Sequence, residues 1–165
     1  MLGNDVVDLA LAQKESNWKR NGFLEKIFTK NEQQLIQLTS NPEVMVWNLW
    51  SRKEAAYKIY NRETGISGYF PSQIECTYED QNWGTVAIRG RTYFTKTSIS
   101  KTYVYTIAVI KRDILSRVQK LDFTDSILKY NGIPFVLCEK SMKLKPASVS
   151  HHGDFWEGIT IDEIE

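Results

Sequence analysis

Glu54 is the residue whose position most needs a chemical explanation. It stands in WSRKEAAYK at residues 50–58, four residues after an apolar run over 44–50 that contains two tryptophans. At about 100° per residue, a helix would place on one face Trp47, Trp50, Glu54, Lys58 and Asn61. Glu54 and Lys58 are four apart, in the order that favours an ion pair worth about 0.2–0.5 kcal/mol. On local grounds a solvated surface pair accounts for both charges, so a chemical role for Glu54 needs support from elsewhere in the chain.

Two more carboxylates lie in the opening segment, GNDVVDL. Asp5 and Asp8 are three apart, so in an extended strand their side chains point to opposite faces. Only one of them can belong to a given site. Asp5 is therefore either a candidate metal ligand or a strand-end carboxylate that accepts backbone hydrogen bonds beside Gly3.

A third group of polar residues, SVSHHGDF, lies near the C-terminus and carries His151 and His152. A histidine at the end of a strand is more often a surface or capping residue than a ligand. Neighbours on a strand also face opposite ways, so the two histidines lack the spacing of a metal pair. Taken by itself, this segment predicts a strand followed by a Gly-Asp turn.

The composition predicts an ordinary globular domain to hold these residues. With 165 residues, 42% hydrophobic and 25% charged, and a net charge of +1, the chain can bury about 70% of its unfolded surface and has no charge excess for binding nucleic acid. Cys76 and Cys138 are too few for a disulfide framework and fit a reducing compartment. The N-terminus lacks a basic leader region, and no apolar stretch reaches the roughly 18 residues of a membrane span. We therefore expect a cytoplasmic protein with no membrane partner.

Helical patterns fill much of the chain up to about Asn61. The segment LGNDVVDLAL reads as a strand in which Gly3 allows a bend, and helix-prone sequence starts at Gln13. Helical spacing of apolar residues recurs over 23–28, and Thr29 with Glu32 forms a capping-box pattern before a short helix to Leu38. Asn41 and Pro42 open the main helix, which should run to about Asn61.

The rest of the chain is strand-like. Alternation over 73–110 predicts an antiparallel meander. A short amphipathic piece of undecided type follows within 111–130, and strand-like runs cover 133–140 and 147–161. There is no evident internal repeat or linker, so the prediction is one α+β domain over 1–165, with an antiparallel sheet packed on a long central helix.

Five stretches, in this order, resemble the 4′-phosphopantetheinyl transferase superfamily, specifically its short holo-[acyl-carrier-protein] synthase type. They are GNDVVDL, FLEKIFTKNE, WSRKEAAYK, NGIPFVLCEK and ASVSHHGDF, of which the third matches the family's K-E-A-x-x-K helix motif. The resemblance covers residues 1–75 and 130–165. It implies that about 76–130 is an added meander with no counterpart in the short members, which are commonly homotrimers with active sites between subunits.

The resemblance also implies roles for the residues introduced above. Asp5 and Glu54 match the family's metal-binding carboxylates, and oxygen ligands completed by phosphates and water are what Mg²⁺ prefers. Lys58 matches the lysine that contacts the coenzyme A phosphates and assists the departing one, so the implied catalytic residues are Glu54 and Lys58. His151 matches the histidine near the adenosine phosphate end, so the implied coenzyme contacts are Lys58 and His151.

The implied reaction moves the 4′-phosphopantetheine arm of coenzyme A to a serine of an acyl or peptidyl carrier protein and releases 3′,5′-ADP, as fatty acid or polyketide biosynthesis requires. The serine proton must reach a base, which could be Glu54 or a water activated by the ion. In the short family members, basic residues that meet the acidic carrier directly follow the opening strand. Here the corresponding basic residues come slightly later in the sequence, at Lys14, Lys19 and Arg20. Two other functions stay open: a catalytically silent module that binds coenzyme A or the carrier, and a metal-dependent phosphohydrolase.

Overall fold

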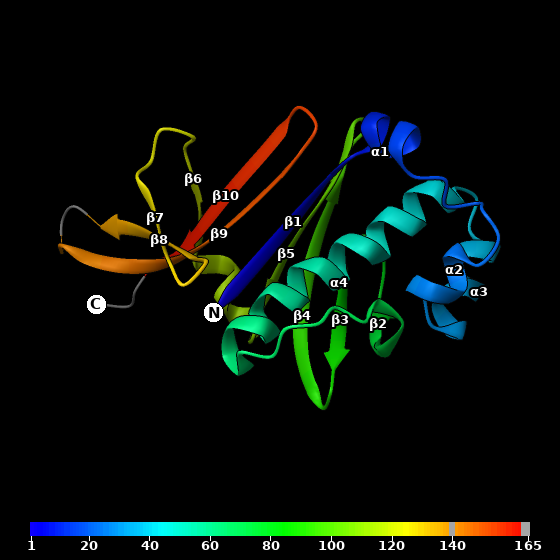
Figure 1. Ribbon diagram of the computed structural model, residues 1–165, viewed down its shortest axis with the longest axis horizontal. Coiled ribbons are helices and arrows are strands. Elements are labelled where there is room, and N and C mark those ends of the chain that lie inside the picture. The colour runs from blue at the N-terminus through cyan, green and yellow to red at the C-terminus, as the bar shows by residue number, and fades with distance from the viewer. Residues whose placement is uncertain (139–140, 163–165) are drawn as a thin grey trace.

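The computed structural model describes residues 1–138 and 141–162, and over these residues it confirms the α+β class (Figure 1). Two five-stranded antiparallel sheets have the strand orders β1-β5-β4-β3-β2 and β6-β10-β9-β8-β7. The first sheet consists of β1 (Leu2–Asp8), β2 (Ile74–Tyr78), β3 (Trp83–Ile88), β4 (Arg91–Ile99) and β5 (Tyr103–Val109). The second consists of β6 (Val118–Leu121), β7 (Ile127–Tyr130), β8 (Ile133–Cys138), β9 (Lys143–His152) and β10 (Phe155–Ile161). The strand-like run predicted over 133–140 ends with two residues that lie outside the described part.

The helices are α1 (Leu9–Glu15), α2 (Phe23–Ile27), α3 (Lys30–Leu38) and α4 (Pro42–Thr64), and short 3₁₀ turns cover η1 (Pro71–Gln73) and η2 (Arg112–Arg117). The undecided segment 111–130 thus contains one 3₁₀ turn and two short strands. No helix in the described residues combines the length and the apolar character needed to cross a bilayer. Whether the segment from 76 to 130 is an added one, and whether 1–165 forms a single domain, stay predictions.

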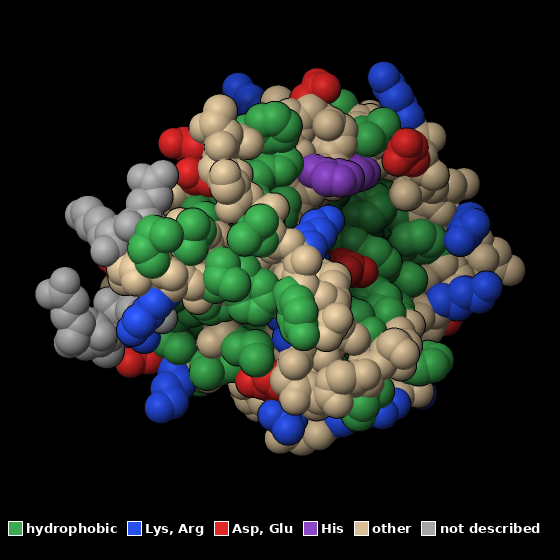
Figure 2. All heavy atoms as spheres, turned by 60° about the vertical axis from the view of Figure 1, so that its left-hand side comes forward, with side chains coloured by type: hydrophobic (Ala, Val, Ile, Leu, Met, Phe, Trp, Pro, Cys, Tyr) green, Lys and Arg blue, Asp and Glu red, His purple; other side chains and the backbone are tan. Residues whose placement is uncertain are grey.

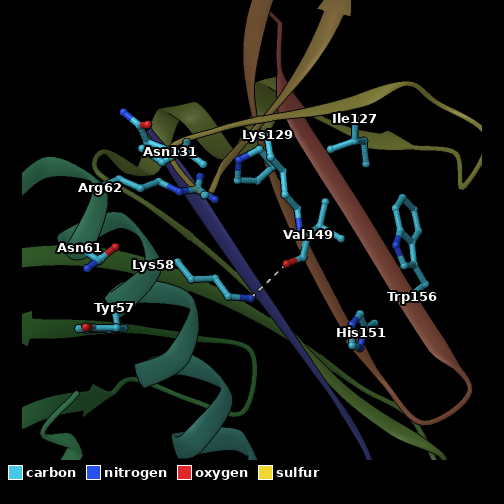
Figure 3. A pocket seen from close by; sticks show the side chains of 13 residues that line it. Tyr57, Lys58, Asn61, Arg62, Ile127, Lys129, Asn131, Val149, His151 and Trp156 are labelled. Carbon is cyan, nitrogen blue, oxygen red and sulfur yellow. Dashed lines mark hydrogen bonds between the residues drawn. The ribbon is translucent and has the colours of Figure 1, made fainter. Parts of the chain in front are cut away.

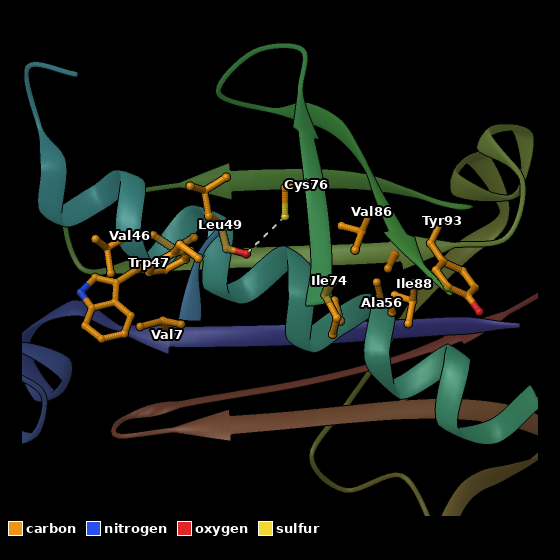
Figure 4. Close-up of a cluster of buried hydrophobic side chains, with 14 of the residues drawn as sticks. Val7, Val46, Trp47, Leu49, Ala56, Ile74, Cys76, Val86, Ile88 and Tyr93 are labelled. Carbon is orange, nitrogen blue, oxygen red and sulfur yellow. Dashed lines mark hydrogen bonds between the residues drawn. The ribbon is translucent and has the colours of Figure 1, made fainter. Parts of the chain in front are cut away.

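The long helix α4 lies across one face of the first sheet (Figure 1). Asn41 caps it by accepting a hydrogen bond from the Val44 amide at 3.2 Å, and Pro42 stands in its first turn. The helix ends at Thr64, three residues later than predicted, and Gly65 follows it in the left-handed region with φ of 67°. The buried face of α4 includes Met45, Leu49, Ala56 and Tyr60, and it packs on β2 and β3 through Ile74 and Val86 (Figure 4).

β1 approaches α4 closely because Gly3 has no side chain. A Cβ atom at this position would collide with the carbonyl oxygen of Ala55 in α4. Gly3 is therefore required for packing, where the sequence suggested a bend. The same approach places the odd-numbered side chains of β1, Asp5 among them, on the face of the strand that meets α4.

The first helix begins earlier than predicted. The strand ends at Asp8, whose side chain accepts a hydrogen bond from the Leu11 amide at 3.1 Å and caps α1. The sequence predicts that residues 9–11 continue the strand, because a short apolar run alone does not separate a strand from a short helix. The predicted capping box of α3 is confirmed, with Thr29 and Glu32 exchanging both hydrogen bonds.

The two charges that precede Glu54 in the WSRKEAAYK motif are structural. The Lys53 ammonium lies 2.6 Å from the Glu32 carboxylate, with both side chains fully buried, and it donates to the carbonyls of Ile27 and Pro71. The Arg52 guanidinium donates to three carbonyl oxygens, two in the turn between β2 and β3 and one at the first residue of β3. Because buried charges need partners, these contacts tie α4 to its surroundings and leave Glu54 and Lys58 for another task.

Candidate active site

The outer edge of β1 is held by side chains of β9. This edge carries backbone amides that need partners, as at any strand edge. Three alternate amides donate to three alternate side chains of β9: Asn4 N to Ser148 Oγ at 3.1 Å, Val6 N to Ser150 Oγ at 3.1 Å, and Asp8 N to His152 Nδ1 at 2.9 Å. We call this row the side-chain ladder. The matching period of two along both strands fixes how the two sheets meet.

Two cationic side chains of α4 donate hydrogen bonds to the carbonyl oxygens of this edge. Each bridges one carbonyl of β1 and one of β9: Lys58 Nζ donates to Asn4 O at 2.6 Å and to Val149 O at 3.3 Å, and Arg62 Nη1 donates to Leu2 O at 3.2 Å and to Ala147 O at 2.9 Å. Burial lowers the pKa of both groups, and for Lys58 the charges of Asp5 and Glu54 oppose that shift. Lys58 thus stands where the helix and both sheets meet.

Asp5 points into this junction with one oxygen bonded and one orphaned. Its Oδ1 accepts a hydrogen bond from Ser150 Oγ at 3.2 Å and lies 4.0 Å from Lys58 Nζ. Its Oδ2 is buried and has no hydrogen-bond partner in the described part of the chain. Burial raises the pKa of Asp5 to about 7, with Lys58 lowering it and Glu54 raising it. An orphaned carboxylate oxygen of this kind suits a cation.

Asp5 and Glu54 line one cavity of about 240 Å³ together with Trp47, Trp50, His151 and His152. Burial also raises the pKa of Glu54, against the attraction of Lys58. The described residues contain no cluster of three or more acidic, histidine or cysteine side chains that could enclose a metal. Two carboxylates that leave the other positions to water and phosphate fit Mg²⁺, which keeps several waters and rarely takes an all-protein cage.

A larger cavity of about 610 Å³ adjoins the first (Figure 3). α4 lines it with Tyr57, Lys58, Asn61 and Arg62, and the second sheet lines it with residues that include Lys129, Val149, His151 and Trp156. His151 is exposed and lines both cavities, so it stands where the two meet. Figure 2 shows histidine, basic and acidic side chains next to one another at a hollow in the face of the molecule that it presents.

Sequence comparison identifies the family. Residues 1–108 match the 4′-phosphopantetheinyl transferase superfamily. The chain belongs to this superfamily. A holo-[acyl-carrier-protein] synthase of Caldanaerobacter subterraneus subsp. tengcongensis is 29% identical over 90 residues, 54% of this chain and 68% of that protein. One of Natranaerobius thermophilus is 28% identical over 107 residues, 63% of this chain and 82% of that protein.

The fold of this transferase also occurs in solved relatives. The Helicobacter pylori holo-[acyl-carrier-protein] synthase, solved in complex with coenzyme A, superposes with a TM-score of 0.52 at 18% identity, covering 66% of this chain and 98% of that one. The predicted fold and the predicted enzyme class, a 4′-phosphopantetheinyl transferase, are therefore confirmed. The roles of Asp5, Glu54, Lys58 and His151 stay predictions, although the structure brings all four to one junction.

The structure adds residues to this transferase site that the sequence did not single out. Ser150 holds Asp5, while Arg62 and Ser148 hold the edge of β1 beside it. The alternation Ser-x-Ser-x-His over 148–152 was the available signal, because such spacing puts three polar side chains on one face of a strand. Asp8 stays outside the cluster, as expected from its offset of three residues from Asp5.

Proposed function

We propose that this chain transfers the 4′-phosphopantetheine arm of coenzyme A to a serine of an acyl or peptidyl carrier protein. The observation that supports this best is the pairing of the two cavities. The smaller one holds two carboxylates, one of them with an orphaned oxygen, and the larger one holds cations and is the size of a small-molecule site. A divalent ion in the first and the coenzyme in the second would bring a pyrophosphate to their junction.

Asp5 and Glu54 would hold the ion, which we expect to be Mg²⁺. When bound, Mg²⁺ neutralises phosphate oxygens during phosphoryl transfer. The orphaned Asp5 oxygen, with a second carboxylate lining the same cavity, fits a divalent cation. Both carboxylates should lose their excess protons when the ion binds.

Lys58 and Glu54 would perform the transfer itself. The carrier serine oxygen bonds to the β-phosphorus of coenzyme A, the bond from that phosphorus to the bridging oxygen breaks, and 3′,5′-ADP leaves. Lys58, already bonded at the junction, would stabilise the negative charge that grows on the departing phosphate. Glu54 would accept the serine proton, because its carboxylate lines the cavity at which the serine oxygen must approach the coenzyme pyrophosphate. His151 would contact the coenzyme phosphates from the other wall.

The carrier would dock beside α1. Lys14, Lys19 and Arg20 are all exposed there, and Ser16 between them lines the cavity of Asp5 and Glu54. Exposed charges of this kind chiefly set the encounter rate. We therefore expect transfer to slow as salt is added, through a rise in KM for the carrier.

The test is an intact-mass assay with purified protein, Mg²⁺, coenzyme A and a panel of apo carrier proteins. The expected result is a carrier heavier by one phosphopantetheine arm, together with stoichiometric 3′,5′-ADP. Phosphate release without a mass gain would instead indicate a phosphohydrolase. Coenzyme binding without either product would indicate a silent module, and each of these two results would overturn the proposal.

A further inference from the structure

The larger cavity has two chemically different walls. In Figure 3, Lys58 and Arg62 project from α4 on one side, and Trp156 lies on the opposite side with Ile127 above it. Lys58 and Arg62 are already bonded to backbone carbonyls of β1 and β9. A ligand that fills the cavity therefore meets, on one side, two cations that are already hydrogen-bonded to the protein. On the other side it meets apolar and aromatic side chains.

Lys129 is a third cation at this cavity and differs from the other two. It stands on β7, lines the cavity and is exposed. Its ammonium makes no hydrogen bond or ion pair within the described residues, and in Figure 3 the side chain reaches inward toward Val149. A cation that points into a cavity, with no partner among the described residues, is available to an anionic group of the ligand.

The Trp156 ring is held in place before any ligand arrives. Phe123 packs edge-on against it, with ring centroids 5.4 Å apart and planes at 79°. On the strand itself the ring lies over Gly158, where a Cβ atom would collide with it. A half-buried tryptophan fixed in this way presents a flat surface at low entropic cost, which suits stacking on a planar ring.

We propose that Trp156 stacks on the adenine of coenzyme A and that Lys129 pairs with its 3′-phosphate. This inference rests on the proposed function, and it concerns which nucleotide the cavity selects. Stacking between a base and an aromatic side chain is favourable for any base, so Trp156 supplies affinity. The charge-assisted contact of Lys129 supplies selectivity for the 3′-phosphate over a coenzyme that lacks it.

The test measures binding of 3′,5′-ADP and of 5′-AMP by isothermal titration calorimetry. We expect Lys129→Met to weaken 3′,5′-ADP about tenfold and to leave 5′-AMP within about twofold, which removes the preference for the 3′-phosphate. We expect Trp156→Leu to weaken both nucleotides by about tenfold, and Trp156→Phe to restore most of that loss. Matched controls are Lys30→Met in α3 and Trp18→Leu in the turn after α1, which alter the same residue types away from the cavity and should bind nucleotides as wild type.

The outcomes separate this inference from the proposed function. If the wild-type chain transfers the arm but Lys129→Met keeps its preference for 3′,5′-ADP, or Trp156→Leu binds like Trp18→Leu, the assignment is wrong. If the wild-type chain neither binds 3′,5′-ADP nor modifies any carrier, the proposed function itself fails. Lys129 is exposed, so its variant should keep the fold, and the Trp156→Phe comparison covers the case in which Trp156→Leu does not.

Discussion

The two edges of β1 are held by different means. Toward β5, seven residues from Leu2 to Asp8 pair in antiparallel register with Val109 to Tyr103. Toward β9, which belongs to the other sheet, the side-chain ladder and the two cations of α4 take the place of a backbone partner. A backbone pairing tolerates most side chains, whereas the β9 edge depends on the identity of each one.

The difference shows where chemistry can be placed in this fold. On the β5 edge the amide and carbonyl groups satisfy one another and leave nothing for a ligand. On the β9 edge the satisfying groups are hydroxyl, imidazole and ammonium groups, and Ser150 and Lys58 also reach Asp5. The groups that join the two sheets are thus the ones that border the proposed ion and coenzyme sites.

The largest effect is expected from Glu54→Gln, which leaves both edges of β1 intact. Transfer should fall at least about 100-fold, because an amide cannot help to hold Mg²⁺ or accept the serine proton. The thermal midpoint should not fall, since the replacement is isosteric and Glu54 is destabilised in its charged form by burial. The intact-mass assay measures this, with Glu25→Gln at an exposed position of α2 as the control. Wild-type turnover in Glu54→Gln would remove Glu54 from the mechanism.

The next effect is a dependence of folding stability on pH, caused by Asp5 at the edge of β1 that faces β9. The pKa of Asp5 is raised to about 7 from 3.8, so between these values the folded state holds a proton that the unfolded state has released. Stability should therefore fall as pH rises from about 4 to about 7, by as much as a few kcal/mol. Glu54, with its pKa also raised, adds to the same slope.

Urea unfolding at several pH values in EDTA measures this slope. Asp5→Asn should flatten it and keep the fold, and Mg²⁺ should stabilise the wild-type chain at pH 8 but not this variant. An unchanged slope in Asp5→Asn would show that Asp5 is not the buried carboxyl responsible.

A third prediction compares a serine of the side-chain ladder with a serine at an exposed strand position. Ser148 is fully buried and exchanges two hydrogen bonds with Asn4. Ser148→Ala should cost about 2 kcal/mol of unfolding free energy, because it leaves two buried polar groups of Asn4 without this partner. Ser98→Ala, the same change at an exposed position of β4, should cost less than about 0.5 kcal/mol, and equal costs would mean that the ladder contributes nothing special.

The smallest effect is expected from Ser150→Ala. It removes the hydrogen bonds to the Val6 amide and to Asp5 Oδ1. Turnover should fall about tenfold and the unfolding free energy by about 1 kcal/mol, with the Mg²⁺ concentration for half-maximal rate rising. A stability loss with no change in the Mg²⁺ requirement would confine Ser150 to a structural role.

Sequence reasoning performed well where signals are local and less well where they are not. The caps at Asn41 and Thr29 predicted where two of the helices begin, because a capping side chain lies within a few residues of what it caps. The start of α1 was missed because Asp8 and the apolar residues after it fit either a strand or a capped helix. The ladder joins residues 144 positions apart, and nothing in either segment alone specifies the other as its partner.

The site followed the same rule. Asp5, Glu54, Lys58 and His151 could be named only because motif order supplied the long-range information that spacing lacks. Lys58 also bridges the two sheets. This structural role depends on the position of Val149 O and could not be predicted from the sequence. Arg62 escaped notice for the same reason.

The central claim is that Asp5 and Glu54 share a divalent ion, and a crystal grown with Mn²⁺ and coenzyme A tests it most directly. We predict one anomalous difference peak bonded to a carboxylate oxygen of each residue, at about 2.0–2.2 Å as for small hard cations, and in contact with the coenzyme pyrophosphate. A bound coenzyme with no peak between the two carboxylates, or with a peak that touches neither, would contradict the account.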